Sequence, residues 1–185
     1  PQTVRIETPD HDFIDLDFHQ CGNGDTANLA VVSHGLEGSS RRGHQLGMAR
    51  HLTANGWDVI CYNFRGCSGE MNRLPRLYHS GVTDDLHTVL TYGLDRKSYE
   101  RAALIGFSMG GNQTLKYLGE NPEMVPKQVS SAVVFSVPCQ LADCVELMSR
   151  WENRMYMKYF LTTLKEKVRI KAEHFPGLID LDGLD

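Results

Sequence analysis

The chain has no long apolar run. None of its 185 residues belong to a stretch of the roughly 18 apolar residues that a membrane-spanning helix needs. It has no basic stripe either: the net charge is -4, and Arg41-Arg42 is too short a cluster to predict a nucleic-acid partner. Its histidines lack zinc-ligand spacing, so we expect no metal site. These absences argue against a membrane span in this chain, a nucleic-acid partner and a metal site.

Cysteine shows no pairing pattern. The chain has five cysteines, an odd number, with no Cys-x-x-Cys pair among them. This favours free thiols in a reducing compartment, with a disulfide as the alternative, and we therefore expect a cytoplasmic protein. No signal peptide is recognisable, but the chain begins with Pro1 in place of Met, so an upstream leader or anchor stays open. The oligomeric state is not readable from the sequence.

The length predicts one domain, and the pattern of apolar residues along it predicts the α/β class. Two opening segments alternate apolar and polar residues, whereas the later ones are continuous apolar runs typical of strands covered on both faces. Helical patterns separate these later runs, which predicts right-handed crossovers and a mostly parallel sheet with helices on both faces. The expected strands are 4–7, 13–18, 29–32, 59–64, 102–105 and 132–137.

Strand patterns stop at Pro138, and 141–173 reads as helical. We therefore divide the chain into a core at 1–138 and a helical cap or lid at 139–185. The stretch 147–164 is rich in Met and aromatic residues, and two interpretations are open. It is either packed helix core or a cap over the active site, in which Met148 and Met155 contact the substrate and Met157 adds to an acyl pocket.

The segment Gly106-Phe107-Ser108-Met109-Gly110 carries the strongest functional signal. It fits Gly-x-Ser-x-Gly, with the apolar run 102–105 before it and a helix-compatible stretch at 112–118 after it. A strand, a tight turn and a helix with serine at the apex form a nucleophile elbow, in which small neighbours relieve the strain of the turn. Ser108 is therefore the predicted catalytic nucleophile.

A serine nucleophile needs donors for the oxyanion that forms on its substrate. In an elbow, one donor is the backbone N–H of the next residue, here Met109. The glycine-rich loop after the third strand reads Ser33-His34-Gly35-Leu36-Glu37-Gly38. We expect the Leu36 N–H to be the second donor, with Gly35 allowing close approach of the backbone and His34 packing beneath the loop.

Taken together, the chain resembles the α/β-hydrolases, and within them the YheT-type branch related to mammalian abhydrolase-domain lipases. The matching segments are Thr8-Pro9-Asp10 with 13–17, His34-Gly35-Leu36-Glu37-Gly38-Ser39-Ser40, Asn63-Phe64-Arg65-Gly66-Cys67-Ser68-Gly69-Glu70, Tyr78-His79-Ser80-Gly81 with Asp84-Asp85-Leu86, and 106–112. The resemblance implies an α/β-hydrolase fold with a cap that begins after the sixth strand. It also implies hydrolysis of an ester or acylglycerol through Ser108, with no metal or organic cofactor.

The resemblance also exposes a gap. In such hydrolases the catalytic acid and histidine follow two later strands, and this chain ends before any such strand. A local triad of Ser108, Asp143 and His174 has the usual chain order, but His174 follows no strand. We therefore expect the acid and base beyond residue 185. The function expected is a serine carboxylic-ester hydrolase; an acyltransferase on the same site, or a non-catalytic binding protein of this fold, is the alternative.

Overall fold

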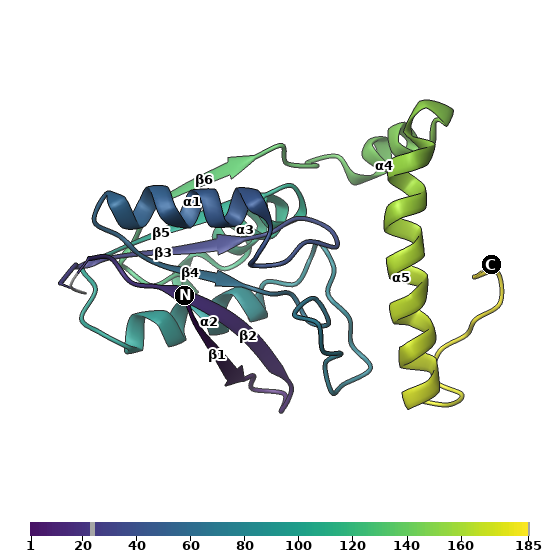
Figure 1. Ribbon diagram of the computed structural model, residues 1–185, viewed down its shortest axis with the longest axis horizontal. Coiled ribbons are helices and arrows are strands. Elements are labelled where there is room, and N and C mark those ends of the chain that lie inside the picture. Colours follow the sequence, from purple (N-terminus) through teal and green to yellow (C-terminus); the bar gives the residue numbers. More distant parts are fainter. Residues whose placement is uncertain (23–24, 185) are drawn as a thin grey trace.

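The computed structural model of the chain describes residues 1–22 and 25–184. In this part of the chain, six strands form one sheet in the order β1-β2-β4-β3-β5-β6 (Figure 1). The strands are β1 (Gln2–Glu7), β2 (Phe13–His19), β3 (Asn28–Ser33), β4 (Asp58–Tyr62), β5 (Arg101–Phe107) and β6 (Val129–Phe135). The helices are α1 (Gly43–Ala54), α2 (Asp84–Asp95), α3 (Met109–Glu120), α4 (Leu141–Ser149) and α5 (Arg154–His174), with short 3₁₀ turns at Pro122–Met124 and Trp151–Asn153.

The sheet is mostly parallel, which confirms the predicted fold class. β1 and β2 are antiparallel to their neighbours, whereas β4, β3, β5 and β6 run parallel to one another. All six strands expected from the sequence are present, with shifts of a few residues at their ends. The carboxyl ends of β3, β5 and β6 point toward α5 (Figure 1), so residues that follow these strands meet at one edge of the sheet.

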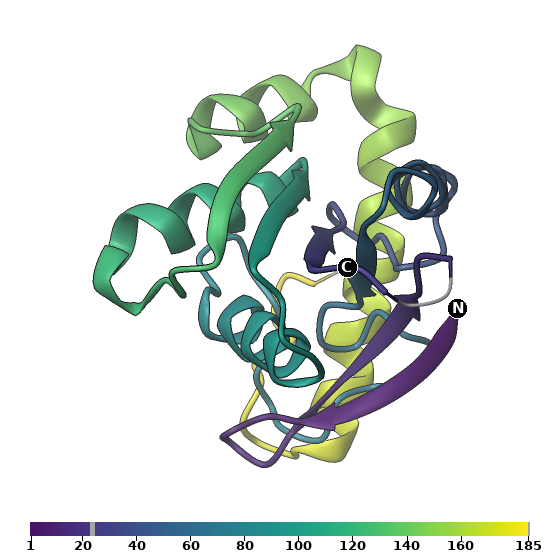
Figure 2. The same cartoon turned by 90° about the vertical axis from the view of Figure 1, so that its left-hand side faces the viewer.

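Helices cover both faces of the sheet (Figure 2). On one face, α2 and α3 pack against Leu29, Val31 and Leu104 with side chains such as Leu86, Leu90 and Tyr117. On the other, α1 places Ala49 against Val32, Val59 and Ile105. The central strands are therefore buried on both sides, as their continuous apolar sequence indicates.

Strand β6 differs from its prediction as a buried strand. It pairs with β5 along one edge, but Val133 is 50% exposed and Phe135 is 40% exposed. β6 also ends at Phe135, two residues earlier than its apolar run predicts, because Ser136 adopts a φ of 51° that a strand cannot continue. The apolar run therefore predicts a strand here correctly, but it does not predict that side chains of this strand are exposed.

The segment after β6 is not one continuous helix. Arg150 takes an extended ψ of 150°, which separates α4 from α5. The interpretation of this segment as packed core is wrong, because Trp151, Met155 and Tyr156 are 69–87% exposed. In Figure 1, α5 stands beside the carboxyl edge of the sheet. Among the described residues, no helix combines the length and the apolar character that crossing a membrane requires.

The loop after β4 is braced by a buried arginine. The Arg65 guanidinium donates to Asp85 at 2.6 Å, to Asp10 at 2.8 Å and to Asp12 at 3.2 Å. Burial lowers the pKa of Arg65, but the hydrogen bonds that it donates to Asp85 and Asp10 outweigh this effect and hold the pKa above its ordinary value. This network ties the loop after β4 to the turn between β1 and β2 and to the first turn of α2.

Candidate active site

Ser108 lies at the apex of the turn between β5 and α3. It has a φ of 52° and a ψ of -119°, a backbone conformation that a non-glycine residue rarely adopts. Its N–H donates to the Phe135 carbonyl oxygen at 2.8 Å, and its own carbonyl accepts from the Asn112 N–H at 3.1 Å. The strained turn is thus held by β6 on one side and by the first turn of α3 on the other, which is the geometry of a nucleophile elbow.

The glycines of the elbow are required by space. A Cβ atom on Gly106 would lie 2.5 Å from the Gly110 carbonyl oxygen, and one on Gly110 would meet the carbonyl oxygens of Ser33 and His34. One on Gly111 would lie 2.7 Å from a methyl group of Val137. No real Cβ atom comes as close to backbone as those on Gly106 and Gly110 would, so strand, turn and helix can pack together only with glycine at these two positions.

The loop after β3 approaches Ser108 closely, as predicted. A Cβ atom on Gly35 would lie 3.6 Å from the Ser108 hydroxyl oxygen. Within the part of the chain that the structure describes, the backbone N–H groups of Leu36 and Met109 have no hydrogen-bond acceptor. Two backbone donors without acceptors beside a serine that lines a pocket are the groups that an oxyanion site requires.

His34 packs beneath the loop after β3, as we expect from the sequence. It is fully buried, and its Nε2 accepts the Phe64 N–H at 3.1 Å. Its Nδ1–H therefore donates to the Gly35 carbonyl oxygen at 2.7 Å, which supports the loop from beneath. Burial lowers the pKa of His34 to about 4, so the ring is neutral and fixed in one tautomer at pH 7.

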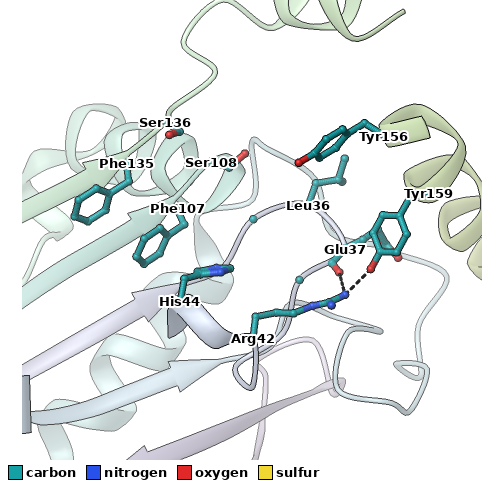
Figure 3. Close-up of a pocket in the computed structure, with 12 residues that line it drawn as sticks. Leu36, Glu37, Arg42, His44, Phe107, Ser108, Phe135, Ser136, Tyr156 and Tyr159 are labelled. Carbon is teal, nitrogen blue, oxygen red and sulfur yellow. Dashed lines mark hydrogen bonds between the residues drawn. The ribbon is translucent and has the colours of Figure 1, made fainter. Parts of the chain in front are cut away.

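Ser108 opens into a cavity of about 520 Å³, which we call the Ser108 pocket (Figure 3). Aromatic rings form one wall: Phe107 stacks on Phe135 with 4.9 Å between ring centroids, and His44 lies 4.8 Å from Phe107. The lining residues are Gly35, Leu36, Glu37, Gly38, Arg42, His44, Phe107, Ser108, Phe135, Ser136, Tyr156 and Tyr159.

The residues that α5 brings to the pocket differ from those expected. Met148 and Met155 do not line it, and the Met155 side chain is 87% exposed. Tyr156 and Tyr159 lie there instead, three residues apart and so on one face of the helix. Figure 3 shows the Tyr159 hydroxyl beside Arg42, which donates to it at 2.6 Å. The spacing of the two tyrosines could have predicted that they share a face of the helix. The sequence pattern instead favours methionines, because their flexible side chains suit an acyl pocket.

No base contacts the nucleophile in the described residues, where the Ser108 hydroxyl makes no hydrogen bond. His174 is excluded as a local partner because it ends α5, roughly 22 Å along the helix axis from Tyr159 at 1.5 Å per residue. His44 lines the pocket but donates to and accepts from no other described side chain. The same part of the chain contains no cluster of His, Cys, Asp or Glu that could hold a metal ion.

The sequence is similar to several curated proteins. It is 34% identical over 98% of its length to the putative esterase YheT of Escherichia coli, and 31% identical over 96% to the phospholipase ABHD3 of Bos taurus. The aligned region makes up 53% of the first relative and 44% of the second, so the chain spans about half the length of the curated relatives it matches.

Solved structures have the same fold. The esterase Pf2001 of Pyrococcus furiosus superposes with a TM-score of 0.68 at 22% identity, over 99% of this chain and 64% of that one. The family described as the alpha/beta hydrolase fold matches residues 31–168, which include the loop after β3, the elbow and most of α5. The chain therefore belongs to the α/β-hydrolase family, within its YheT-type branch.

Proposed function

We propose that this chain carries the nucleophile and the oxyanion hole of a serine carboxylic-ester hydrolase. The observation that supports this best is the strained Ser108, which lines a pocket beside the unbonded N–H groups of Leu36 and Met109. Backbone strain at a polar residue that faces a cavity is typical of a catalytic site.

In the proposed reaction, the Ser108 oxygen attacks the ester carbonyl carbon while a histidine takes the hydroxyl proton. Charge develops on the carbonyl oxygen and is stabilised by the N–H groups of Leu36 and Met109. The alcohol leaves with the proton from the histidine, and an acyl group remains on Ser108. Water then attacks this acyl group, releases the acid and returns a proton to Ser108. The histidine and its acidic partner are expected outside this chain.

The pocket supports an acyl or lipid ester as substrate. The stacked rings of Phe107 and Phe135 and the ring of Tyr156 offer an apolar surface beside the nucleophile. Relatives of this chain have names that specify an esterase, a phospholipase and a monoacylglycerol lipase. We place the acyl chain against these rings, and assign no role to Met148 or Met155 because they lie outside the pocket.

Hydrolysis of p-nitrophenyl acyl esters by the full-length protein tests the proposal. Ser108→Ala should lower kcat by about 10³-fold or more, since loss of one member of a catalytic triad removes most of the catalysis. Ser136→Ala is a matched control, because Ser136 is a second serine with positive φ that lines the same pocket. It should retain activity within a few fold. Equal turnover by the Ser108 variant and the wild type would refute the assignment.

Two other functions of the same fold can be separated by experiment. An acyltransferase would pass the acyl group to an alcohol or thiol, so product analysis with and without an acceptor distinguishes it from a hydrolase. A binding protein without catalysis would leave Ser108 unreactive toward a fluorophosphonate probe. Labelling of the wild type together with release of free acid favours the hydrolase over both.

A further inference from the structure

Glu37 occupies a backbone position that normally favours glycine. Its φ is 51°, in the turn closed by the hydrogen bond from the Gly38 N–H to the Gly35 carbonyl oxygen at 3.0 Å. A non-glycine residue in the left-handed region costs of order 1–3 kcal/mol and persists only when its surroundings hold it there. Contacts of the glutamate side chain are therefore needed to offset this cost.

Those contacts are present and buried. The Glu37 carboxylate accepts from the Lys167 ammonium at 2.8 Å and from the Tyr78 hydroxyl, and it is almost completely shielded from water. The Glu37 backbone N–H donates to the same Tyr78 hydroxyl at 3.0 Å. One residue thus bonds Tyr78 through both its backbone and its side chain, which fixes the peptide between Leu36 and Glu37.

Both members of the ion pair are charged at neutral pH. Burial raises the pKa of Glu37, but the hydrogen bonds from Lys167 and Tyr78 outweigh it and hold that pKa below its ordinary value. Burial lowers the pKa of Lys167, whereas Cys67, whose sulfur lies 3.2 Å away, and Glu37 raise it above its ordinary value. A charged pair with little access to water is costly to break, because each partner would remain buried without compensation.

The pair joins elements that are distant in the sequence. Glu37 follows β3, whereas Lys167 lies on α5, 130 residues later. A second link runs in parallel: Arg42 donates to the Glu37 carbonyl oxygen at 3.3 Å and to the Tyr159 hydroxyl of α5 at 2.6 Å (Figure 3). The loop that presents the Leu36 N–H to the Ser108 pocket is therefore attached to α5 on two sides.

We propose that Glu37 and Lys167 are positioning residues for the oxyanion hole, which make the placement of the Leu36 N–H depend on the docking of α5. The inference rests on the proposed function, since it assumes that this N–H binds a developing oxyanion. Glu37 lines the Ser108 pocket, but its carboxylate is bonded to Lys167 and Tyr78, and the Lys167 ammonium also lies 3.2 Å from the Cys67 sulfur. The segment after β6 then does more than cover the pocket: it helps to shape the catalytic loop.

Three variants of the full-length protein test this inference. Glu37→Gly removes the carboxylate but suits the positive φ, and Lys167→Met removes the charge but keeps the apolar stem. Each should lower kcat about 10- to 100-fold and leave KM within about twofold, because loss of a whole oxyanion donor costs ~10²–10³. Lys158→Met is the matched control: Lys158 is an exposed lysine of the same helix, and its loss should leave kcat unchanged.

A tetrahedral-adduct inhibitor separates positioning from folding. A trifluoromethyl ketone forms an oxyanion on Ser108, so its affinity should fall by the same factor as kcat in Glu37→Gly and Lys167→Met. Lys167→Arg should restore part of both. The inference is overturned if the wild type is active and these variants have its kcat and inhibitor affinity. It is also overturned if the variants yield less folded protein but the folded fraction has wild-type kcat. If the wild type hydrolyses no ester, the proposed function fails and the inference fails with it.

Discussion

Gly35 faces the side chain of Ser108, and a Cβ atom added to it would lie 3.1 Å from the Ser108 Cβ and 3.6 Å from the hydroxyl oxygen. The first distance is tighter than side chains normally tolerate. The loop after β3 and the elbow are therefore in contact through a residue that has no side chain, which lets the loop backbone approach Ser108 closely.

The contact predicts that Gly35→Ala impairs catalysis more than folding. The added methyl group must push the loop away from Ser108 by a few tenths of an ångström, which displaces the Leu36 N–H. We expect kcat for a p-nitrophenyl ester to fall about 10-fold or more, since a misplacement of 1 Å can cost 10²-fold. Gly43→Ala, where an added Cβ meets open space, serves as the control. Equal kcat in the two variants would contradict the argument.

The elbow glycines predict a contrast in stability. Gly110→Ala would force a Cβ atom against the carbonyl oxygens of Ser33 and His34, and overpacking of this kind costs about 1–3 kcal/mol of unfolding free energy. Gly47→Ala and Gly119→Ala lie in helices where an added Cβ has free space, so each should stabilise the protein by about 0.5–1 kcal/mol. Urea unfolding of the full-length variants measures all three. A stabilised Gly110→Ala would be the contrary result.

The buried His34 predicts loss of stability on mild acidification. Its pKa is about 4 in the folded protein against 6.5 for the free side chain. Between these values the unfolded chain binds a proton that the folded chain does not, so unfolding free energy rises with pH from 4 to 6.5 and falls as pH is lowered. The contribution of this one residue is roughly 3 kcal/mol across that window, at about 1.4 kcal/mol per pKa unit.

His34→Gln provides the measurement, because glutamine keeps polar atoms but does not titrate in this range. Thermal melting of the full-length protein between pH 4 and 7 should show a smaller pH dependence in the variant than in the wild type. His19 and His44, whose pKa values burial also lowers, contribute with the same sign and remain in both proteins. Asp10, whose pKa is about 2, loses its contribution only below pH 4. Identical slopes would exclude His34 as the source.

Local patterns predicted the parts of the site that are contiguous in the chain. The elbow was recognisable because the pattern of 102–118 predicts a strand, a turn and a helix in succession. Its glycines stand where a Cβ atom would collide with this segment or with neighbouring segments. The loop at 33–38 was recognisable for the same reason. The strand ends were less predictable: the expected strand runs to Phe64, but β4 ends at Tyr62, and the Phe64 N–H donates to the His34 side chain and not to a strand backbone.

The sequence by itself determined the fold class and predicted Ser108, Met109 and Leu36 as site residues, because each of these inferences depends on short-range geometry and on the absence of side chains at fixed positions. Only the tertiary structure decided what surrounds them. It decided that β6 is partly exposed and that Tyr156 and Tyr159, not Met148 and Met155, line the pocket. It also decided that Glu37 pairs with Lys167, 130 residues later in the chain, through the packing of α5 against the sheet edge. Such packing is set by contacts between segments far apart in the chain, which helical periodicity and residue spacing do not specify.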